Sequence, residues 1–188
     1  MKILKTVTAG LMLAATPLLA QAEGMSYSYL DLGYVETDID GVGPKADGFA
    51  ARGSVGIADN FFVFAEYADQ SVSVVDFKQY AVGLGGHFGL SDNLDLVGRA
   101  GWAKAEASGF GASFDDDGYL VSVGLRSRLG ANVELEGSAI HTDFGDNSDD
   151  TALAVGARYH FNKNFAVGAE YQHGDDASSI LAGVRLSF

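Results

Sequence analysis

Apolar and polar side chains alternate along most of this sequence, and that alternation is the feature that most restricts the possible folds. Leu30, Leu32 and Tyr34 take every second position of one segment, and Asp31 lies between the two leucines. Consecutive side chains of a β-strand point to opposite faces, so alternation of this kind predicts strands with one apolar and one polar face. An all-β fold is therefore expected.

Four tight turns of similar sequence separate pairs of alternating segments, and each ends in Asn followed by an apolar residue. Asn and Asp favour such reversals because they tolerate left-handed backbone angles and hydrogen-bond to their own backbone. The turns lie at 58–61, 91–94, 130–133 and 162–165. Dividing the sequence at these turns and at the longer Asp-, Gly- and Ser-rich segments between them predicts ten strands. They lie at about 26–37, 47–58, 61–69, 77–88, 94–106, 117–129, 132–143, 151–162, 165–173 and 177–188.

The short turns alternate with longer connections near 38–46, 70–76, 107–116, 144–150 and 174–176. An even number of strands with this alternation is typical of outer-membrane barrels, whose periplasmic turns are short and whose outer loops are longer. We therefore predict a ten-stranded antiparallel transmembrane β-barrel with short periplasmic turns and acidic outer loops.

The side chains at the polar, alternate positions of the predicted strands (the polar parity) indicate what fills the barrel. A barrel in lipid turns its apolar face outward and accepts polar side chains inside, and all six arginines fall on the polar parity. Buried arginines need carboxylate partners, which predicts a plugged, ion-paired lumen; an open, selective channel is the alternative. Bulky inward Phe62 and Phe64 favour the plugged form. The expected network comprises Asp31, Arg52, Glu66, Arg99, Arg126, Arg128, Glu134, Glu136, Arg158, Glu170 and Arg185.

Aromatic residues on the outward parity gather at both ends of the predicted strands. Such girdles are typical of membrane interfaces, where an apolar ring and a polar tip are both satisfied. A soluble β-sandwich also alternates, but it needs no aromatic bands at both rims. The girdle at the long-loop end comprises Tyr34, Phe49, Tyr67, Tyr80, Trp102, Tyr119 and Tyr171, and the girdle at the short-turn end comprises Phe61, Phe88, Phe161, Phe165 and Phe188.

The first residues have the pattern of an export signal. Lys2 and Lys5 accompany an apolar run that extends to Ala20, and Ala20-Gln21-Ala22 has the small-x-small pattern of a signal peptidase site. We predict a signal peptide at 1–22 and a barrel domain at 23–188.

Composition excludes several classes of function. Loss of Lys2 and Lys5 leaves ten basic and 25 acidic side chains, a formal charge of −15, which argues against nucleic acid as a partner. The chain has no cysteine, so it has neither a disulfide framework nor a thiolate metal site nor a catalytic thiol. Beyond the leader, the longest stretch without charged residues, 79–91, has 13 residues and is too short for a spanning helix.

The C-terminal run Gly183-Val184-Arg185-Leu186-Ser187-Phe188 resembles the closing strand of small Gram-negative outer-membrane barrels of the OmpA/Opa-like superfamily. The resemblance implies that Gly183, Leu186 and Phe188 form the assembly signal read by the barrel-assembly machinery, although Leu181 stands where the family usually has a polar residue. The segments 26–34, 37–41 and 59–64 are similar to the Ax-type outer-membrane proteins of xanthomonad-like bacteria. This likeness implies outer-membrane localisation, surface exposure and release in membrane vesicles.

Catalytic chemistry has little support in the sequence. His141 is followed by Thr142 and falls on the lipid-facing parity, His87 and His160 lie at the periplasmic ends, and His173 is expected to be a solvated rim residue. We therefore predict no catalytic site, no cofactor and no defined metal site. A Ser and a His at hydrogen-bonding distance near the outer rim would favour a lipid-active barrel enzyme.

Carboxylates dominate the predicted outer loops and suit Ca²⁺ or Mg²⁺, but Asp38-x-Asp40-Gly41 matches only the start of a calcium loop. These loops are expected to share bridging cations with lipopolysaccharide phosphates, so outer-membrane lipid and lipopolysaccharide are the expected partners of a monomeric protein. The predicted function is structural or surface-interacting, without enzymatic activity. A narrow porin-like channel for small solutes is the second hypothesis, and a lipid-active enzyme is the third.

Overall fold

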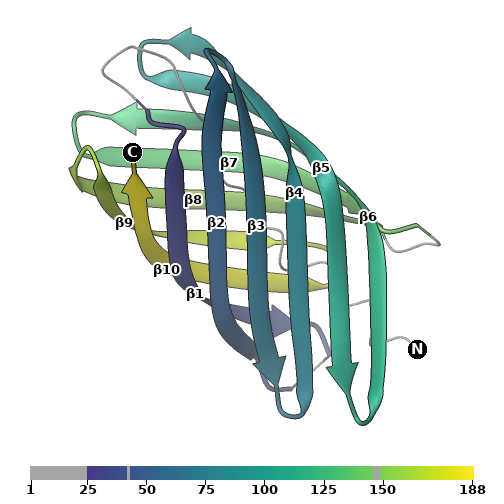
Figure 1. The fold of residues 1–188 in the computed structure, drawn as a ribbon. Helices are drawn as coiled ribbons and strands as arrows, with labels where there is room; N and C mark the ends of the chain where they lie inside the picture. Colours follow the sequence, from purple (N-terminus) through teal and green to yellow (C-terminus); the bar gives the residue numbers. More distant parts are fainter. Residues whose placement is uncertain (1–24, 42, 146–148) are drawn as a thin grey trace.

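The computed structural model describes residues 25–188 except 42 and 146–148, and it is a closed barrel of antiparallel strands (Figure 1). The predicted signal peptide lies outside the described residues. The ten strands expected from the sequence are confirmed: β1 (Tyr29–Ile39), β2 (Ala46–Ala58), β3 (Phe61–Val72), β4 (Val75–Ser91), β5 (Leu94–Gly109), β6 (Ala112–Leu129), β7 (Val133–Asp143), β8 (Asp149–Asn162), β9 (Phe165–His173) and β10 (Ala177–Ser187). The described residues contain no helix that is long and apolar enough to cross a membrane.

Each strand pairs with its neighbours in sequence, and β1 closes the barrel by pairing with β10. Asp31 lies opposite Arg185 across this seam, and Gly33 lies opposite Gly183. A Cβ on Gly183 would lie 2.3 Å from the carbonyl oxygen of Leu32, so the close approach of the first and last strands requires glycine there.

The four repeated turns share a hydrogen-bonding pattern that explains their Asn. In the turn between β2 and β3, the carbonyl of Asn60 accepts the backbone N–H of His87 (3.0 Å), and its side-chain amide donates to the carbonyl of His87 (3.1 Å). These contacts extend the strand ladder by one residue, and none of the four Asn has a positive φ. Left-handed tolerance is therefore not the reason for the repeat. The equivalent pairs are Asn93 with Arg128, Asn132 with His160, and Asn164 with Ser187.

At the other end of the barrel, two of the expected long loops are absent. The strands continue instead, and two-residue turns join β3 to β4 and β5 to β6, so the loops expected near 70–76 and 107–116 are wrong. Ser73, Phe110 and Gly111 have positive φ angles of 58°, 54° and 78°, which is how these turns reverse so tightly. The β5–β6 hairpin extends well beyond the seam strands (Figure 1).

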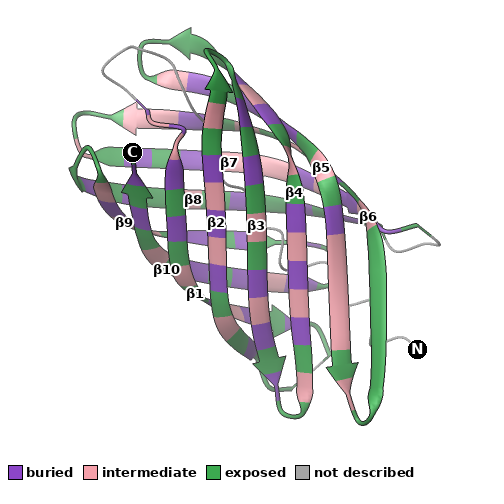
Figure 2. Ribbon diagram, viewed as in Figure 1, coloured by how far each residue is buried: buried purple, intermediate pink, exposed green. Residues whose placement is uncertain are grey.

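Burial alternates along the strands as the sequence pattern predicts (Figure 2). In β1, for example, Val35 is completely buried, whereas Tyr34 is 46% exposed. The apolar face of the strands therefore points outward, and the interior is filled by polar side chains together with a buried apolar cluster.

Candidate functional site: the lumen and the lipid-facing surface

A network of ion pairs occupies the interior of the barrel around Glu134 of β7. Its carboxylate is completely buried and lies 2.7 Å from Nη2 of Arg126. Two further guanidinium groups approach it, those of Arg158 and Arg185, each at 3.3 Å. His160 lies 3.1 Å away, so three strands, β6, β8 and β10, place four cationic or hydrogen-bonding groups on one carboxylate.

Some ion pairs cross the lumen between strands that do not pair with each other. Arg52 of β2 donates to Glu170 of β9 (3.1 Å), although its neighbours in register are Asp31 and Glu66. Arg99 of β5 likewise bonds Glu66 of β3, two strands away. Long guanidinium side chains in a narrow barrel therefore reach carboxylates beyond the neighbouring strand.

Other arginines of the predicted network bond carboxylates on adjacent strands. Arg185 donates to Asp31 through Nε (2.7 Å) and Nη2 (2.6 Å), which is a bidentate bridge across the seam. Arg158 bonds Glu136 at 2.7 Å. Arg128 lies nearer the short-turn mouth, where it donates to the carbonyl of Ala131 (3.3 Å).

Apolar side chains fill the part of the lumen bounded by β3 to β7. Phe62 and Phe64 of β3 are buried and lie opposite Gly85 and Gly83 of β4. A Cβ on Gly85 would lie 1.8 Å from Cζ of Phe62, so the missing side chain makes room for the ring. Arg99 covers the other phenylalanine, with its Cζ 3.8 Å from the Phe64 centroid. The same cluster includes Val97, Leu120 and Ile140.

Residues 25–28, here called the strap, enter the lumen at the short-turn end. The first strand was expected to begin at 26, but β1 begins at Tyr29. Tyr27 is completely buried, and its hydroxyl bonds Asp95 of β5. Arg126 donates to the carbonyl of Ser26 (3.1 Å) and covers the Tyr27 ring. Neither the strap nor the role of Asp95 was predicted, because both have the inward-facing positions of ordinary strand residues.

The cavity beside the ion pairs is small. It has a volume of about 20 Å³ and is lined by Asp31, Arg52, Arg158, Glu170 and Arg185, among others. That is room for about one water molecule, since a cavity needs a volume of roughly 10–15 Å³ to hold a single water.

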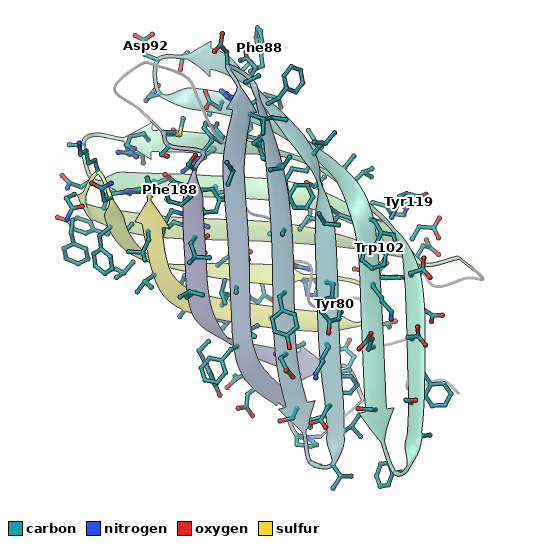
Figure 3. The ribbon with its side chains drawn as sticks, in the orientation of Figure 1. Tyr80, Phe88, Asp92, Trp102, Tyr119 and Phe188 are labelled. Carbon is teal, nitrogen blue, oxygen red and sulfur yellow. The ribbon has the colours of Figure 1, made fainter. Side chains whose placement is uncertain are left out.

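The outward aromatic residues lie in two bands on the lipid-facing surface. Figure 3 shows Phe88 and Phe188 near the short-turn end with Asp92, and Tyr80, Trp102 and Tyr119 further toward the outer end. Phe61, Phe161 and Phe165 accompany the first band at the ends of β3, β8 and β9, and Phe49 and Tyr80 belong to the second. Five members of the outer band hydrogen-bond a polar side chain. The acceptor is two positions nearer the outer rim for Tyr34 with Asp47 (2.8 Å), Tyr67 with Asp69 (2.8 Å), Trp102 with Asp117 (3.2 Å) and Tyr171 with Ser178 (3.3 Å), and it is directly opposite for Tyr119 with Asp143 (3.0 Å).

The predicted assembly residues lie along β10 and at its end. Gly183 faces the seam, whereas Leu186 and Phe188 are exposed on the lipid-facing side. The backbone N–H of Phe188 donates to the carbonyl of Ser28 (3.0 Å), which connects the C-terminal residue to the strap.

The histidines differ in their surroundings. His87 and His160 are buried in the lumen, and His141 hydrogen-bonds Thr151 (3.1 Å) on the outer surface. Nδ1 of His173, which was expected to be solvated, lies 2.8 Å from Oγ of Ser178, so the outer end of the barrel holds a Ser–His pair of the kind that a lipid-active enzyme would need. Among the described residues, no carboxylate bonds the other ring nitrogen of His173. A catalytic Ser–His pair is normally oriented by a third group, and this pair has none among those residues.

The carboxylates expected in the outer loops lie mostly on strands that rise above the outer aromatic band. Asp115, Asp116 and Asp117 belong to β6, and Asp40, Asp175 and Asp176 lie in connections; Asp146 is outside the described residues. Lys45 is bonded to Glu36 (2.6 Å), and this bond raises the pKa of the lysine. The described part of the chain holds no group of three or more metal-ligating side chains arranged for a cation.

Comparison with known structures finds other barrels. The chain is similar to the KdgM porin in complex with disordered oligogalacturonate (13% identity, 86% of this chain and 99% of that chain, TM-score 0.47). It is also similar to the attachment invasion locus protein Ail of Yersinia pestis (21% identity, 85% and 97%, TM-score 0.41) and to the N-terminal barrel domain of OprF of Pseudomonas aeruginosa (12% identity, 86% and 98%, TM-score 0.47).

None of the curated proteins matches the sequence. The family model described as "Outer membrane protein beta-barrel domain" matches residues 6–152, which is more than half of the chain. The chain therefore belongs to the outer-membrane protein β-barrel domain family.

Proposed function

We propose that this outer-membrane protein is a sealed barrel without enzymatic activity, and that its outer surface is the functional part. The observation that carries this proposal is the position of Glu134. Its carboxylate is completely buried, and Arg126, Arg158 and Arg185 lie within 3.3 Å of it. These contacts draw β6, β8 and β10 toward one point of the lumen.

Conduction needs a continuous column of water, and the interior leaves little space for one. The cavity beside the network has a volume of about 20 Å³. Phe62 and Phe64 pack in one buried apolar cluster with Met25 and Tyr27 of the strap. Removing one member of a buried ion pair typically costs about 3–5 kcal/mol, because it leaves the partner charge uncompensated. The sealed state is therefore the low-energy state of this interior.

The test is single-channel recording in planar bilayers. The wild-type protein should show little or no steady current, whereas Glu134→Gln should show current or a marked loss of stability. Asp92→Asn is the matched control, because Asp92 is exposed in the turn between β4 and β5. A large, stable conductance of the wild-type protein would favour the narrow-channel hypothesis. A silent, fully stable Glu134→Gln variant would also contradict the proposal.

The extended β5–β6 hairpin supports a role in surface interaction. β5 continues from Trp102 to Gly109, and the turn presents Phe110, which is 88% exposed. At about 3.3 Å per residue, this extension measures roughly 23 Å along the strand. Replacing 106–115 by a two-residue Asn-Gly turn should reduce attachment of cells that carry the protein, and replacing the β1–β2 connection by Gly and Ser should not. Equal attachment with the shortened hairpin would argue against this role.

The remaining expectations complete the proposal. We infer export through a cleaved signal peptide at 1–22, insertion by the barrel-assembly machinery, a monomeric state among lipopolysaccharide, and release in vesicles as in the Ax-type proteins that the chain resembles. Separation of inner and outer membranes, followed by gel migration with and without boiling, tests localisation and closure together. A closed barrel should migrate faster unheated, because its strand ladder has no free edge.

A further inference from the structure

The outer part of β6 is a strand edge that β7 does not cover. Pairing between β6 and β7 ends where Tyr119 lies opposite Asp143, and within the described ranges no strand pairs with 112–118 on the side away from β5. The other side of the hairpin is covered, because β5 pairs with β4 as far as Gly109. In Figure 1 this part of β6 lies at the free side of the extended hairpin.

The backbone of this edge has hydrogen-bonding groups to spare. Neighbouring residues of a strand direct their backbone groups alternately to its two sides, so pairing with β5 uses only half of those in 112–118. Residues 112–117 are all exposed, whereas the β5 residues opposite them are half-buried apart from Ser108. A row of unpaired N–H and C=O groups is a template for another strand. At about 3.3 Å per residue, this edge is roughly 23 Å long.

The side chains along the edge give it a strong negative charge. Asp115 and Asp117 lie on the outward face of β6, and Asp116 lies on the face toward the barrel axis. Lys104 of β5 lies 3.2 Å from Asp115 and 2.7 Å from Glu106. One lysine against four carboxylates leaves segment 104–117 with a formal charge of −3.

One apolar side chain accompanies these charges. Phe114 is 53% exposed and lies opposite Ala107, which packs against the buried cluster that includes Phe77. An apolar row thus runs across the inner face of the sheet and ends, uncovered, at the free edge. A strand added there would cover one side of the Phe114 ring.

Charge decides between the possible occupants of the edge. Antiparallel pairing of two β6 edges about Asp116 would place Asp115 opposite Asp117 and Asp116 opposite itself. Like charges directly opposite each other destabilise strand pairing, so a second copy of this chain is disfavoured. The phosphates of lipopolysaccharide meet the same repulsion. A cationic strand meets attraction along the whole edge.

We propose that the free edge of β6 binds an extended, basic segment of a partner protein, which adds to the sheet as a further strand. Backbone hydrogen bonds hold the segment, and its side chains select it. Its lysine or arginine side chains lie beside Asp115 and Asp117, and an apolar side chain between them lies against Phe114. The inference rests on the proposed surface role of the β5–β6 hairpin and specifies the class of its partner.

The probe is a labelled seven-residue peptide of alternating Lys and Val, added to the full mature protein in a non-ionic detergent. Fluorescence anisotropy should show saturable binding, and a peptide of alternating Glu and Val should not bind. Hydrogen exchange of the backbone amides in 112–118 should slow when the Lys–Val peptide is bound, because strand addition protects the amides of the edge. Binding without slower exchange there would show attraction by charge alone and would overturn the proposal.

A triple variant tests the charges of the edge. Asp115→Asn with Asp116→Asn and Asp117→Asn should weaken binding of the Lys–Val peptide at least several-fold. The matched control, Asp38→Asn with Asp40→Asn and Asp176→Asn, removes the same charge beside the β1/β10 seam and should bind like the wild-type protein. Equal losses in the two triple variants would overturn the proposal.

A second pair of variants tests the apolar contact. Phe114→Ala should weaken binding, whereas Phe110→Ala, in the turn, should not. Faster migration of unheated samples confirms that each variant has folded. Absence of saturable binding to the wild-type protein would overturn this inference alone. Cell attachment that survives shortening of the hairpin would instead contradict the proposed function, so the two failures are distinguishable.

Discussion

The ring of Tyr27 stacks on the imidazole of His87, with ring centroids 4.2 Å apart and planes inclined by 15°. Tyr27 belongs to the strap and His87 to β4, three strands away from β1 around the barrel. The contact therefore fixes the strap across the short-turn mouth of the lumen.

Tyr27→Ala should lower the free energy of unfolding by about 3–5 kcal/mol, the range for truncating a buried aromatic side chain. Tyr27→Phe keeps the ring and loses the bond to Asp95, so a loss of about 1 kcal/mol is expected. Urea unfolding in detergent, followed by tryptophan fluorescence, measures both. Phe110→Ala, at an exposed turn, is the control and should change little. An unchanged Tyr27→Ala variant would show that the strap contributes no packing.

Gly85→Ala should destabilise the barrel by about 1–3 kcal/mol, as overpacked cores generally do. The added methyl group would lie 1.8 Å from the Phe62 ring, so that ring must move. Combining Gly85→Ala with Phe62→Leu should restore part of the loss. Gly53→Ala is the control, because no atom lies within 4 Å of its Cβ position. The same urea titration measures all of them, and equal stability of the two alanine variants would contradict the close packing.

Trp102 is the chain's single tryptophan, so its fluorescence reports the depth of the outer aromatic band. Its indole N–H donates to Asp117 (3.2 Å), which lies on the rim side. In vesicles, lipids brominated near the headgroup should quench it more strongly than lipids brominated near the chain ends. Stronger quenching by the chain-end bromines would place this band at the bilayer centre and contradict the assigned orientation. Trp102→Phe supplies the background signal.

Deletion of Phe188 should reduce the amount of membrane-inserted protein and increase periplasmic degradation. The residue ends the predicted assembly signal, and its N–H donates to Ser28 (3.0 Å). Phe188→Tyr keeps the aromatic ring and the backbone bond, and it should insert normally. Quantitative blotting of outer-membrane and periplasmic fractions measures the difference. Normal insertion of the truncated chain would show that the signal lies elsewhere.

The alternation in the sequence was sufficient to predict the strands and their inward faces, because parity depends only on position along a strand. It was not sufficient to predict ion-pair partners. Arg52 and Glu170 are 118 residues apart and on strands that do not pair, so their contact depends on the curvature of the closed barrel. The alternation also misleads where a segment leaves the sheet. Tyr27 has the inward position of a strand residue, so the sequence predicted it in the first strand, whereas it lies in the strap before β1.

The prediction of loop lengths was wrong for a different reason. The sequence 107–116 is rich in Ser, Gly and Asp, which is typical of loops, but β5 and β6 pair through most of it. Above the outer aromatic band, both faces of these strands meet water, so the apolar alternation that marks a strand in lipid is lost. Composition alone does not distinguish such a strand from a loop.

The bridge between Asp31 and Arg185 joins residues separated by 154 positions, from the first strand to the last. Until β10 is present, the carboxylate of β1 lacks its bidentate partner, and carrying that charge into an apolar layer is costly. Pairing of Asp31 with Arg185 and closure of the ring are thus one event, which requires nearly the whole polypeptide to be available at once. Insertion of this barrel is thereby coupled to completion of its last strand.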